Sequence, residues 1–236
     1  GYSQETYEAV TGVPGSHARC MRGIELLLER KLPLRLKTVL MNLNYHELEP
    51  MRQFAESLGV EFRVDPLINA GVVEVENPLA TRITPEQVVW YDVHDEQSRQ
   101  SWERSFQRIA AGEQPQDDRL YTCKAGTSSF HIDPYGRLSL CTLEREPYYD
   151  LRQGSFIEGW HSFLNPLAEV HFSPHSACGS CELRSACVRC PGRARLETGD
   201  PEGVSEYYCQ VTQLRQKVFS GVVSLDEIRP AGTVHL

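Results

Sequence analysis

Residues 178–190 read CGSCELRSACVRC, so four cysteines stand in the order Cys-x2-Cys-x5-Cys-x2-Cys. Thiolate sulfur is a soft ligand that suits both zinc and iron–sulfur clusters. Each close pair puts two sulfurs on one short loop, within reach of one metal centre. The stretch therefore predicts a metal-binding loop, and on its own it leaves zinc and iron–sulfur equally open.

Further cysteines flank this stretch on both sides. All but one of the eight cysteines lie between Cys123 and Cys209. The run opens as Cys-x12-Gly-x4-Cys, from Cys123 to Cys141, and closes at Cys209, after a gap of eighteen residues beyond the quoted stretch. A secreted disulfide scaffold with so many cysteines is usually much shorter, so metal ligation explains the pattern better. Cys20 stands apart and is interpreted as a small residue buried in a helix.

Composition narrows the possible partners and location. With 236 residues, the chain is long enough for one large domain or for a domain with a smaller one appended. Its formal net charge of −8 argues against nucleic acids and anionic membrane surfaces, because like charges repel. No apolar run approaches the roughly 18 to 20 residues that cross a bilayer, and no signal segment is visible, so we expect a cytoplasmic protein.

The first part of the chain alternates between helical and extended patterns. Apolar spacing predicts helices over residues 16–31, with Ser16 as the cap, and 46–58. Short aliphatic runs predict strands over residues 34–41, expected to be buried, and 60–68. Strands separated by helices are typical of βαβ units on a parallel sheet, in a barrel or in a doubly wound fold.

The later part is more varied. Thr84 is expected to cap one long polar helix over residues 85–111, with its charges on a solvated face. Residues 112–118 form a polar linker and the expected domain boundary. Alternating segments around Asp133-Pro134-Tyr135-Gly136 then predict a β-hairpin, and residues 151–167 a turn with a short helix.

The ordered cysteines, together with Gly136, resemble the SPASM domain of radical S-adenosylmethionine (radical SAM) enzymes. One departure is the spacing of the last close pair, which has two intervening residues where many members have three. The resemblance implies two auxiliary 4Fe–4S clusters whose ligands interleave along the chain. The first cluster would be bound by Cys123, Cys141 and Cys190, and the second by Cys178, Cys181, Cys187 and Cys209.

The resemblance leaves the first cluster one protein ligand short. Some family members supply a further cysteine about six residues before the first one, and Asp117 occupies that place here. Asp117 is thus a candidate oxygen ligand, although these clusters generally take thiolates. The alternative is an open iron site that faces the substrate.

Two stretches of the first half, YEAVTGVPGS at residues 7–16 and KTVLMN at residues 37–42, are similar to the second half of the radical SAM barrel. Barrels place their chemistry at the carboxyl ends of the strands. Asn42 and Asn44 follow a predicted strand and are candidate contacts for S-adenosylmethionine. Polar residues after a strand are also common turn formers.

The implied fold class is α/β. The resemblance assigns residues 1–112 to the C-terminal half of a partial (βα)6 barrel with a linking helix, residues 113–220 to a cysteine-rich α+β SPASM domain, and residues 221–236 to a tail. The family forms its radical at a Cys-x3-Cys-x2-Cys loop, and no such triplet occurs in the sequence. The chain is therefore expected to be N-terminally truncated and inactive alone.

In the whole enzyme, the resemblance implies hydrogen abstraction from a peptide or protein by a 5′-deoxyadenosyl radical, with flavodoxin or ferredoxin as reductant. A third 4Fe–4S cluster would lie in the missing part. The sulfatase-maturing branch is expected to carry an acidic residue directly after Cys141, where Thr142 stands, and a neutral hydroxyl cannot replace a carboxylate base. Glu144 and Glu146 keep that branch open. Further alternatives are a non-catalytic iron–sulfur electron carrier, a peptide-binding module, and a zinc-stabilised interaction domain.

Overall fold

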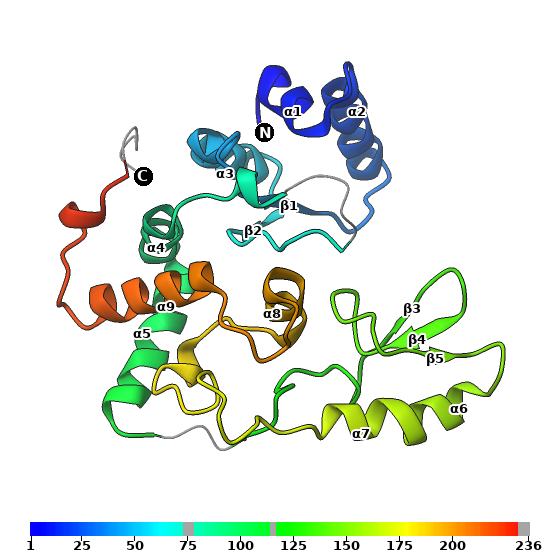
Figure 1. Cartoon of the computed structure of the whole chain (residues 1–236). Coiled ribbons are helices and arrows are strands. Elements are labelled where there is room, and N and C mark those ends of the chain that lie inside the picture. The colour runs from blue at the N-terminus through cyan, green and yellow to red at the C-terminus, as the bar shows by residue number, and fades with distance from the viewer. Residues whose placement is uncertain (73–77, 114–116, 231–236) are drawn as a thin grey trace. The chain divides into compact units, whose positions relative to one another are not determined.

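The computed structural model describes residues 1–72, 78–113 and 117–230 (Figure 1). Its α-helices are α1 (Gln4–Thr11), α2 (Ser16–Glu29), α3 (Leu48–Ser57), α4 (Pro85–His94), α5 (Glu96–Ala110), α6 (Phe156–Gly159), α7 (Asn165–Ala168), α8 (Pro191–Thr198) and α9 (Glu206–Phe219). Its strands are β1 (Arg35–Val39), β2 (Glu61–Asp65), β3 (His131–Ile132), β4 (Arg137–Ser139) and β5 (Tyr149–Asp150).

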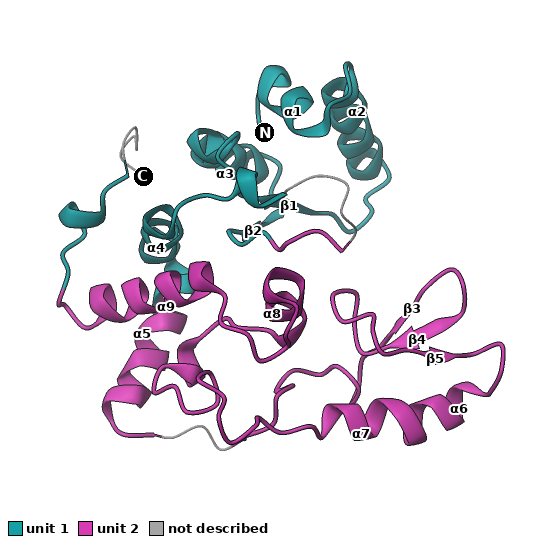
Figure 2. Cartoon of the chain, in the orientation of Figure 1, with its two compact units in different colours: residues 1–68, 76–99, 223–236 teal, residues 69–75, 100–222 magenta. Residues whose placement is uncertain are grey.

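The chain folds into two compact units (Figure 2). Unit 1 comprises residues 1–68, 76–99 and 223–236, and unit 2 comprises residues 69–75 and 100–222. One boundary between the two units therefore falls within α5, between residues 99 and 100, before the predicted linker at residues 112–118. The expected family domains of residues 1–112 and 113–220 stay a prediction.

Unit 1 contains the predicted parallel βαβ arrangement. β1 and β2 pair in parallel, in a register that runs from Arg35 opposite Glu61 to Val39 opposite Asp65. A short 3-10 turn and α3 connect them, and such a crossover is what a parallel pair requires. The mixed α/β class is confirmed, and the barrel itself stays a prediction.

The expectation that residues 34–41 form a buried strand is wrong in part. β1 is shorter, Thr38 is its one buried residue, and Val39 is 37% exposed. Among the described residues β1 pairs with β2 alone, and so small a sheet has little interior. The apolar core of unit 1 lies instead around Leu40 and the helical residues Leu48 and Ala55.

The helix over residues 16–31 begins differently from the prediction. Ser16 is the first residue of α2, and the cap is Gly15, whose φ of 73° lies in the left-handed region that glycine adopts without steric cost. The Ser16 hydroxyl lies 2.7 Å from the hydroxyl of Thr11. It therefore links the two helices instead of capping one.

The long polar helix expected over residues 85–111 is two helices. Thr84 does cap α4, in a capping box with Gln87, as predicted. The helix stops at Asp95, where the backbone is extended, and α5 starts directly after it. α4 is also largely buried, and Asp92, taken from the sequence as solvated, is 2% exposed.

Unit 2 contains the predicted hairpin. β3 and β4 are antiparallel, and Asp133 Oδ1 accepts the backbone N–H groups of Tyr135 and Arg137 at 2.9 Å in the turn between them. β5 adds a third strand that the sequence did not predict. Leu138 of β4 and Leu140 just after it lie in an apolar cluster with Leu164, which belongs to the helical segment α6–α7.

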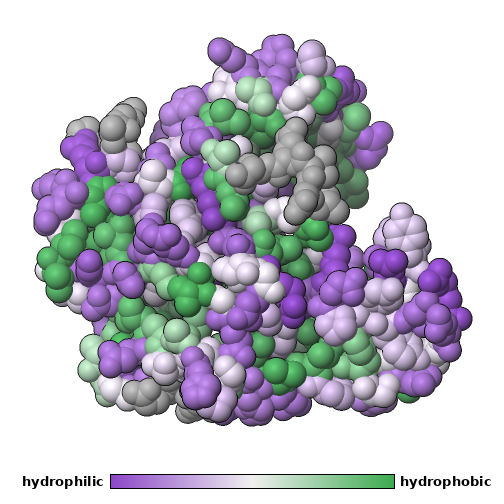
Figure 3. Space-filling model, viewed as in Figure 1, coloured by the Kyte–Doolittle hydropathy of each residue, from purple (hydrophilic) through white to green (hydrophobic). Residues whose placement is uncertain are grey.

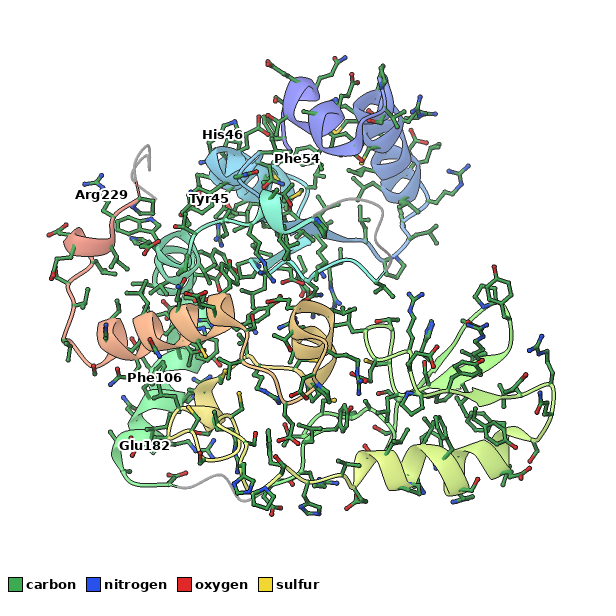
Figure 4. The ribbon with its side chains drawn as sticks, viewed as in Figure 1. Tyr45, His46, Phe54, Phe106, Glu182 and Arg229 are labelled. Carbon is green, nitrogen blue, oxygen red and sulfur yellow. The ribbon has the colours of Figure 1, made fainter. Side chains whose placement is uncertain are left out.

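The α5 and α9 helices are joined by aromatic side chains within unit 2. The rings of Phe106, labelled in Figure 4, and Phe219 stack with centroids 5.9 Å apart. The guanidinium of Arg215 lies 4.1 Å from the centre of the Trp102 ring, and Arg215 is 1% exposed. α9 is therefore anchored independently of Cys209, which it carries.

On the face shown in Figure 3, apolar patches are small and are separated by polar and charged residues. None of the helices in the described part of the chain has both the length and the apolar character that a membrane crossing requires.

Candidate metal centres

The predicted ligands of the first cluster come from three separate segments. Cys123 precedes the hairpin, Cys141 follows β4, and Cys190 is the N-cap residue of α8. Burial raises the pKa of the Cys141 thiol, and the neighbouring thiolates of Cys190 and Cys123 raise it further. These three sulfurs are thus electrostatic neighbours. The backbone N–H of Glu144 also donates to Cys141 Sγ at 3.4 Å.

The predicted ligands of the second cluster form a different group. Burial raises the pKa of the Cys209 thiol, and the thiolates of Cys187, Cys178 and Cys181 raise it further. Burial likewise raises the pKa of Cys178, on which Cys187 and Cys181 also act. The two groups divide the cysteines in the same way as the predicted ligand sets do. The ligand assignment itself stays a prediction.

Within residues 1–72, 78–113 and 117–230, no three His, Cys, Asp or Glu side chains lie close enough together to hold a single metal ion. A 4Fe–4S cluster does not need such a group, because each of its thiolates binds a different iron. The donors in both groups are thiols, which fit iron–sulfur clusters.

A cavity of about 280 Å³ lies beside the second group, and its lining includes Cys187, Arg184 and Arg189. The guanidinium of Arg189 lies 5.0 Å from the centre of the Phe172 ring and donates to the Pro201 carbonyl. Its Nε is buried without a hydrogen-bond partner in the described residues. A buried cationic donor of this kind suits a thiolate-bound cluster of net negative charge.

Asp117, the candidate fourth ligand of the first cluster, is held by an arginine. Both carboxylate oxygens accept from Arg119, at 2.6 Å for Nη2 to Oδ2. Hydrogen bonds from the Arg119 side chain, and then from its backbone, lower the pKa of Asp117 to about 2. Asp117 also lines the cavity beside Cys187, a member of the second group. Its role as a ligand stays untested.

The two asparagines predicted to contact S-adenosylmethionine follow β1, and their side chains form hydrogen bonds with backbone groups. Asn44 is 1% exposed, and its amide accepts from the N–H of Met41 at 2.8 Å and donates to the carbonyl of Val39 at 3.0 Å. Asn42 is exposed and donates to the Ala80 carbonyl. Both have local structural roles, and cofactor contact stays a prediction.

Glu144 is a buried charged residue close to Cys141, and the sequence does not predict its burial. Glu144 is 2% exposed, and its Oε1 accepts from Arg195 Nε at 2.5 Å. Burial raises the pKa of this carboxyl group. The sequence offers only its position three residues after Cys141 as a signal, because no local pattern announces burial of a lone glutamate.

No protein-family model matches the chain. Over 219 residues it is 23% identical to an AdoMet-dependent heme synthase of Methanosarcina barkeri, and the match covers 85% of this chain. The chain spans 62% of the length of that relative. This similarity supports the radical SAM family for the chain, as the resemblance of its motifs predicts.

Proposed function

We propose that this chain is the part of a radical SAM enzyme that carries two auxiliary 4Fe–4S clusters. The observation that supports the proposal is electrostatic: the thiols act on one another's pKa in two groups, and these groups contain the same cysteines as the two interleaved ligand sets. The similarity to an AdoMet-dependent enzyme supports the use of S-adenosylmethionine and of a further 4Fe–4S cluster in the whole protein.

The residues present would hold the auxiliary clusters. Bound there, the clusters would carry electrons or help to hold the substrate. The thiols would bind iron, and Arg189 would offset the negative charge of the second cluster. These 236 residues lack the Cys-x3-Cys-x2-Cys loop, so the chain alone is not expected to form the 5′-deoxyadenosyl radical.

We favour a peptide or protein substrate, modified by hydrogen abstraction, with a small electron carrier such as flavodoxin or ferredoxin as reductant. The heme synthase similarity favours a second candidate, a tetrapyrrole. An enzyme that includes the radical-forming loop distinguishes them, because substrate-dependent release of 5′-deoxyadenosine is expected with the correct class and not with the other.

Anaerobic reconstitution tests the cluster proposal directly. Two 4Fe–4S clusters contain about eight irons and about eight sulfides per chain, and we expect these amounts after unbound iron is removed. Elemental analysis and a sulfide assay provide the measurement. Stoichiometric zinc with little iron would instead support a zinc-stabilised interaction domain.

Replacing Arg189 with glutamine is expected to lower the reduction potential of the second cluster. The positive charge stabilises the more negative reduced state, so its loss favours the oxidised state. We expect a shift on the order of 60 mV, which is tenfold in the equilibrium constant of a one-electron couple. A redox titration followed by electron paramagnetic resonance (EPR) measures it.

Arg184→Gln is the matched control for this substitution. Arg184 lies 5.3 Å from the same Phe172 ring, but it donates to the backbone carbonyls of Gly179 and Asp117. Its loss should shift the potential much less. Equal shifts in the two variants would mean that net charge alone, and not the position of Arg189, sets the potential.

A further inference from the structure

The proposed ligand set gives the first cluster three protein ligands, and Glu144 lies between two of the segments that carry them. Its backbone N–H donates to Cys141 Sγ, and the Cys141 N–H donates to the Glu144 carbonyl at 3.5 Å. Arg195, which donates to the Glu144 carboxylate, belongs to α8, the helix that Cys190 caps. Glu144 therefore links two ligand segments directly.

The third segment reaches the same carboxylate through Tyr121, two residues before Cys123. Burial raises the pKa of Tyr121 to about 12, and the negative charge of Glu144 contributes to the rise. Arg195 acts on the Tyr121 hydroxyl in the opposite direction. Tyr121 also belongs to the buried cluster against which Cys141 packs, so the segment that precedes Cys123 lies beside the loop of Cys141 and Glu144.

The start of α8 lies directly against the Glu144 loop. A Cβ atom added to Gly192 would stand 3.0 Å from Leu143 Cβ and 3.4 Å from the Glu144 nitrogen. The absence of a side chain at Gly192 allows this close approach of the two backbones. The segments that carry Cys141 and Cys190 are therefore held at short range around Glu144.

The Glu144 carboxylate is incompletely satisfied. Its Oε2 is buried and has no hydrogen-bond partner in the described residues, whereas Oε1 is held by Arg195. A buried carboxylate oxygen without a partner is costly, and it calls for an explanation such as a bound cation. Iron accepts carboxylate oxygen as well as thiolate sulfur, and ligating carboxylates are usually themselves hydrogen-bonded.

We propose that Glu144 is the fourth ligand of the first auxiliary cluster, bound through Oε2, with Arg195 orienting the carboxylate through Oε1. This inference rests on the proposed function, because it needs a cluster at Cys123, Cys141 and Cys190. It replaces Asp117 as the ligand, since both oxygens of Asp117 are engaged by Arg119. The competing explanation is an ion pair between Glu144 and Arg195 that only supports the fold.

Mössbauer spectroscopy of the chain reconstituted with 57Fe tests the proposal. One iron of about eight is expected to show an oxygen-containing environment, distinct from the four-sulfur irons. Glu144→Cys should convert that iron to the four-sulfur type, and Glu144→Gln should change its signal. Glu146→Gln, at an exposed glutamate two residues further on, is the matched control and should leave the spectrum unchanged.

Several outcomes would overturn the proposal while leaving the two clusters in place. One is a spectrum of the unaltered chain in which every iron has four sulfur ligands, and this outcome does not depend on whether any variant folds. Another is a distinct iron that persists in Glu144→Cys or Glu144→Gln, or that responds to Asp117→Asn instead. By contrast, an iron content near zero would contradict the proposed function itself.

Discussion

Replacing Cys209 with alanine is expected to remove one whole cluster and about half of the iron, so that about four irons per chain remain. Cys209 is the predicted ligand most distant in sequence from the rest of its set, yet its thiol is influenced by Cys178, Cys181 and Cys187. The helix that carries it should still fold, because Phe219 and Arg215 anchor α9 on α5. The loss should therefore be local to the second cluster.

Double replacements test the interleaving most sharply. Cys187 and Cys190 are close in sequence but belong to different groups, whereas Cys187 and Cys209 are far apart and belong to the same group. The pair Cys187→Ala with Cys209→Ala should lose no more iron than either single variant. The pair Cys187→Ala with Cys190→Ala should lose nearly all of it.

Iron and sulfide counts after anaerobic reconstitution, together with EPR spectra of the reduced chain, give the measurement. Cys20→Ala is the control, because Cys20 lies in unit 1 and outside both groups, and it should keep about eight irons. If the pair at 187 and 190 lost only about four irons, ligands would follow sequence order and the interleaved assignment would be wrong.

Local chemistry explains which elements the sequence predicts well. Thr84 with Gln87 and Asp133 with Gly136 form a cap and a turn within a few residues, and both occur as expected. The break at Asp95 is also local, because its Oδ1 accepts the Ser98 N–H at 2.9 Å and so caps α5, whereas the third strand β5 depends on pairing with β4. Periodicity within a short window cannot detect such contacts.

In the candidate site too, some features could be predicted from the sequence and others depend on the fold. Cysteine spacing predicts thiolate ligands because ligands on one loop must stand at short, fixed separations. The ion pair of Glu144 and Arg195 joins residues from two distant segments, and its burial follows from the fold of unit 2. Arg189 is similar, since its position over Phe172 is unrelated to its spacing from the cysteines. The positions of Glu144, Arg195 and Arg189 in the candidate site can therefore be recognised only in the folded structure.

Replacing Gly126 with alanine is expected to destabilise unit 2 by about 2 kcal/mol more than the same change at Gly136. Both glycines are left-handed, with φ of 74° and 79°, so each variant loses roughly 1 to 2 kcal/mol from backbone strain. At Gly126 the new Cβ would also stand 2.8 Å from Leu140 Cδ2 and 2.9 Å from the Leu164 carbonyl oxygen. Such overpacking adds about 1 to 3 kcal/mol.

Gly136 is a close control because its added Cβ meets nothing nearer than Arg152 Cγ at 3.6 Å. Thermal unfolding of the cluster-loaded chains should show a midpoint for Gly126→Ala roughly 4 to 8 °C below that of Gly136→Ala. Gly126 is three residues from Cys123, and its N–H bonds the Ser129 carbonyl in the same loop. A shift of this loop should therefore also weaken iron retention at the first cluster, whereas equal midpoints and equal iron contents would contradict the close packing around Gly126.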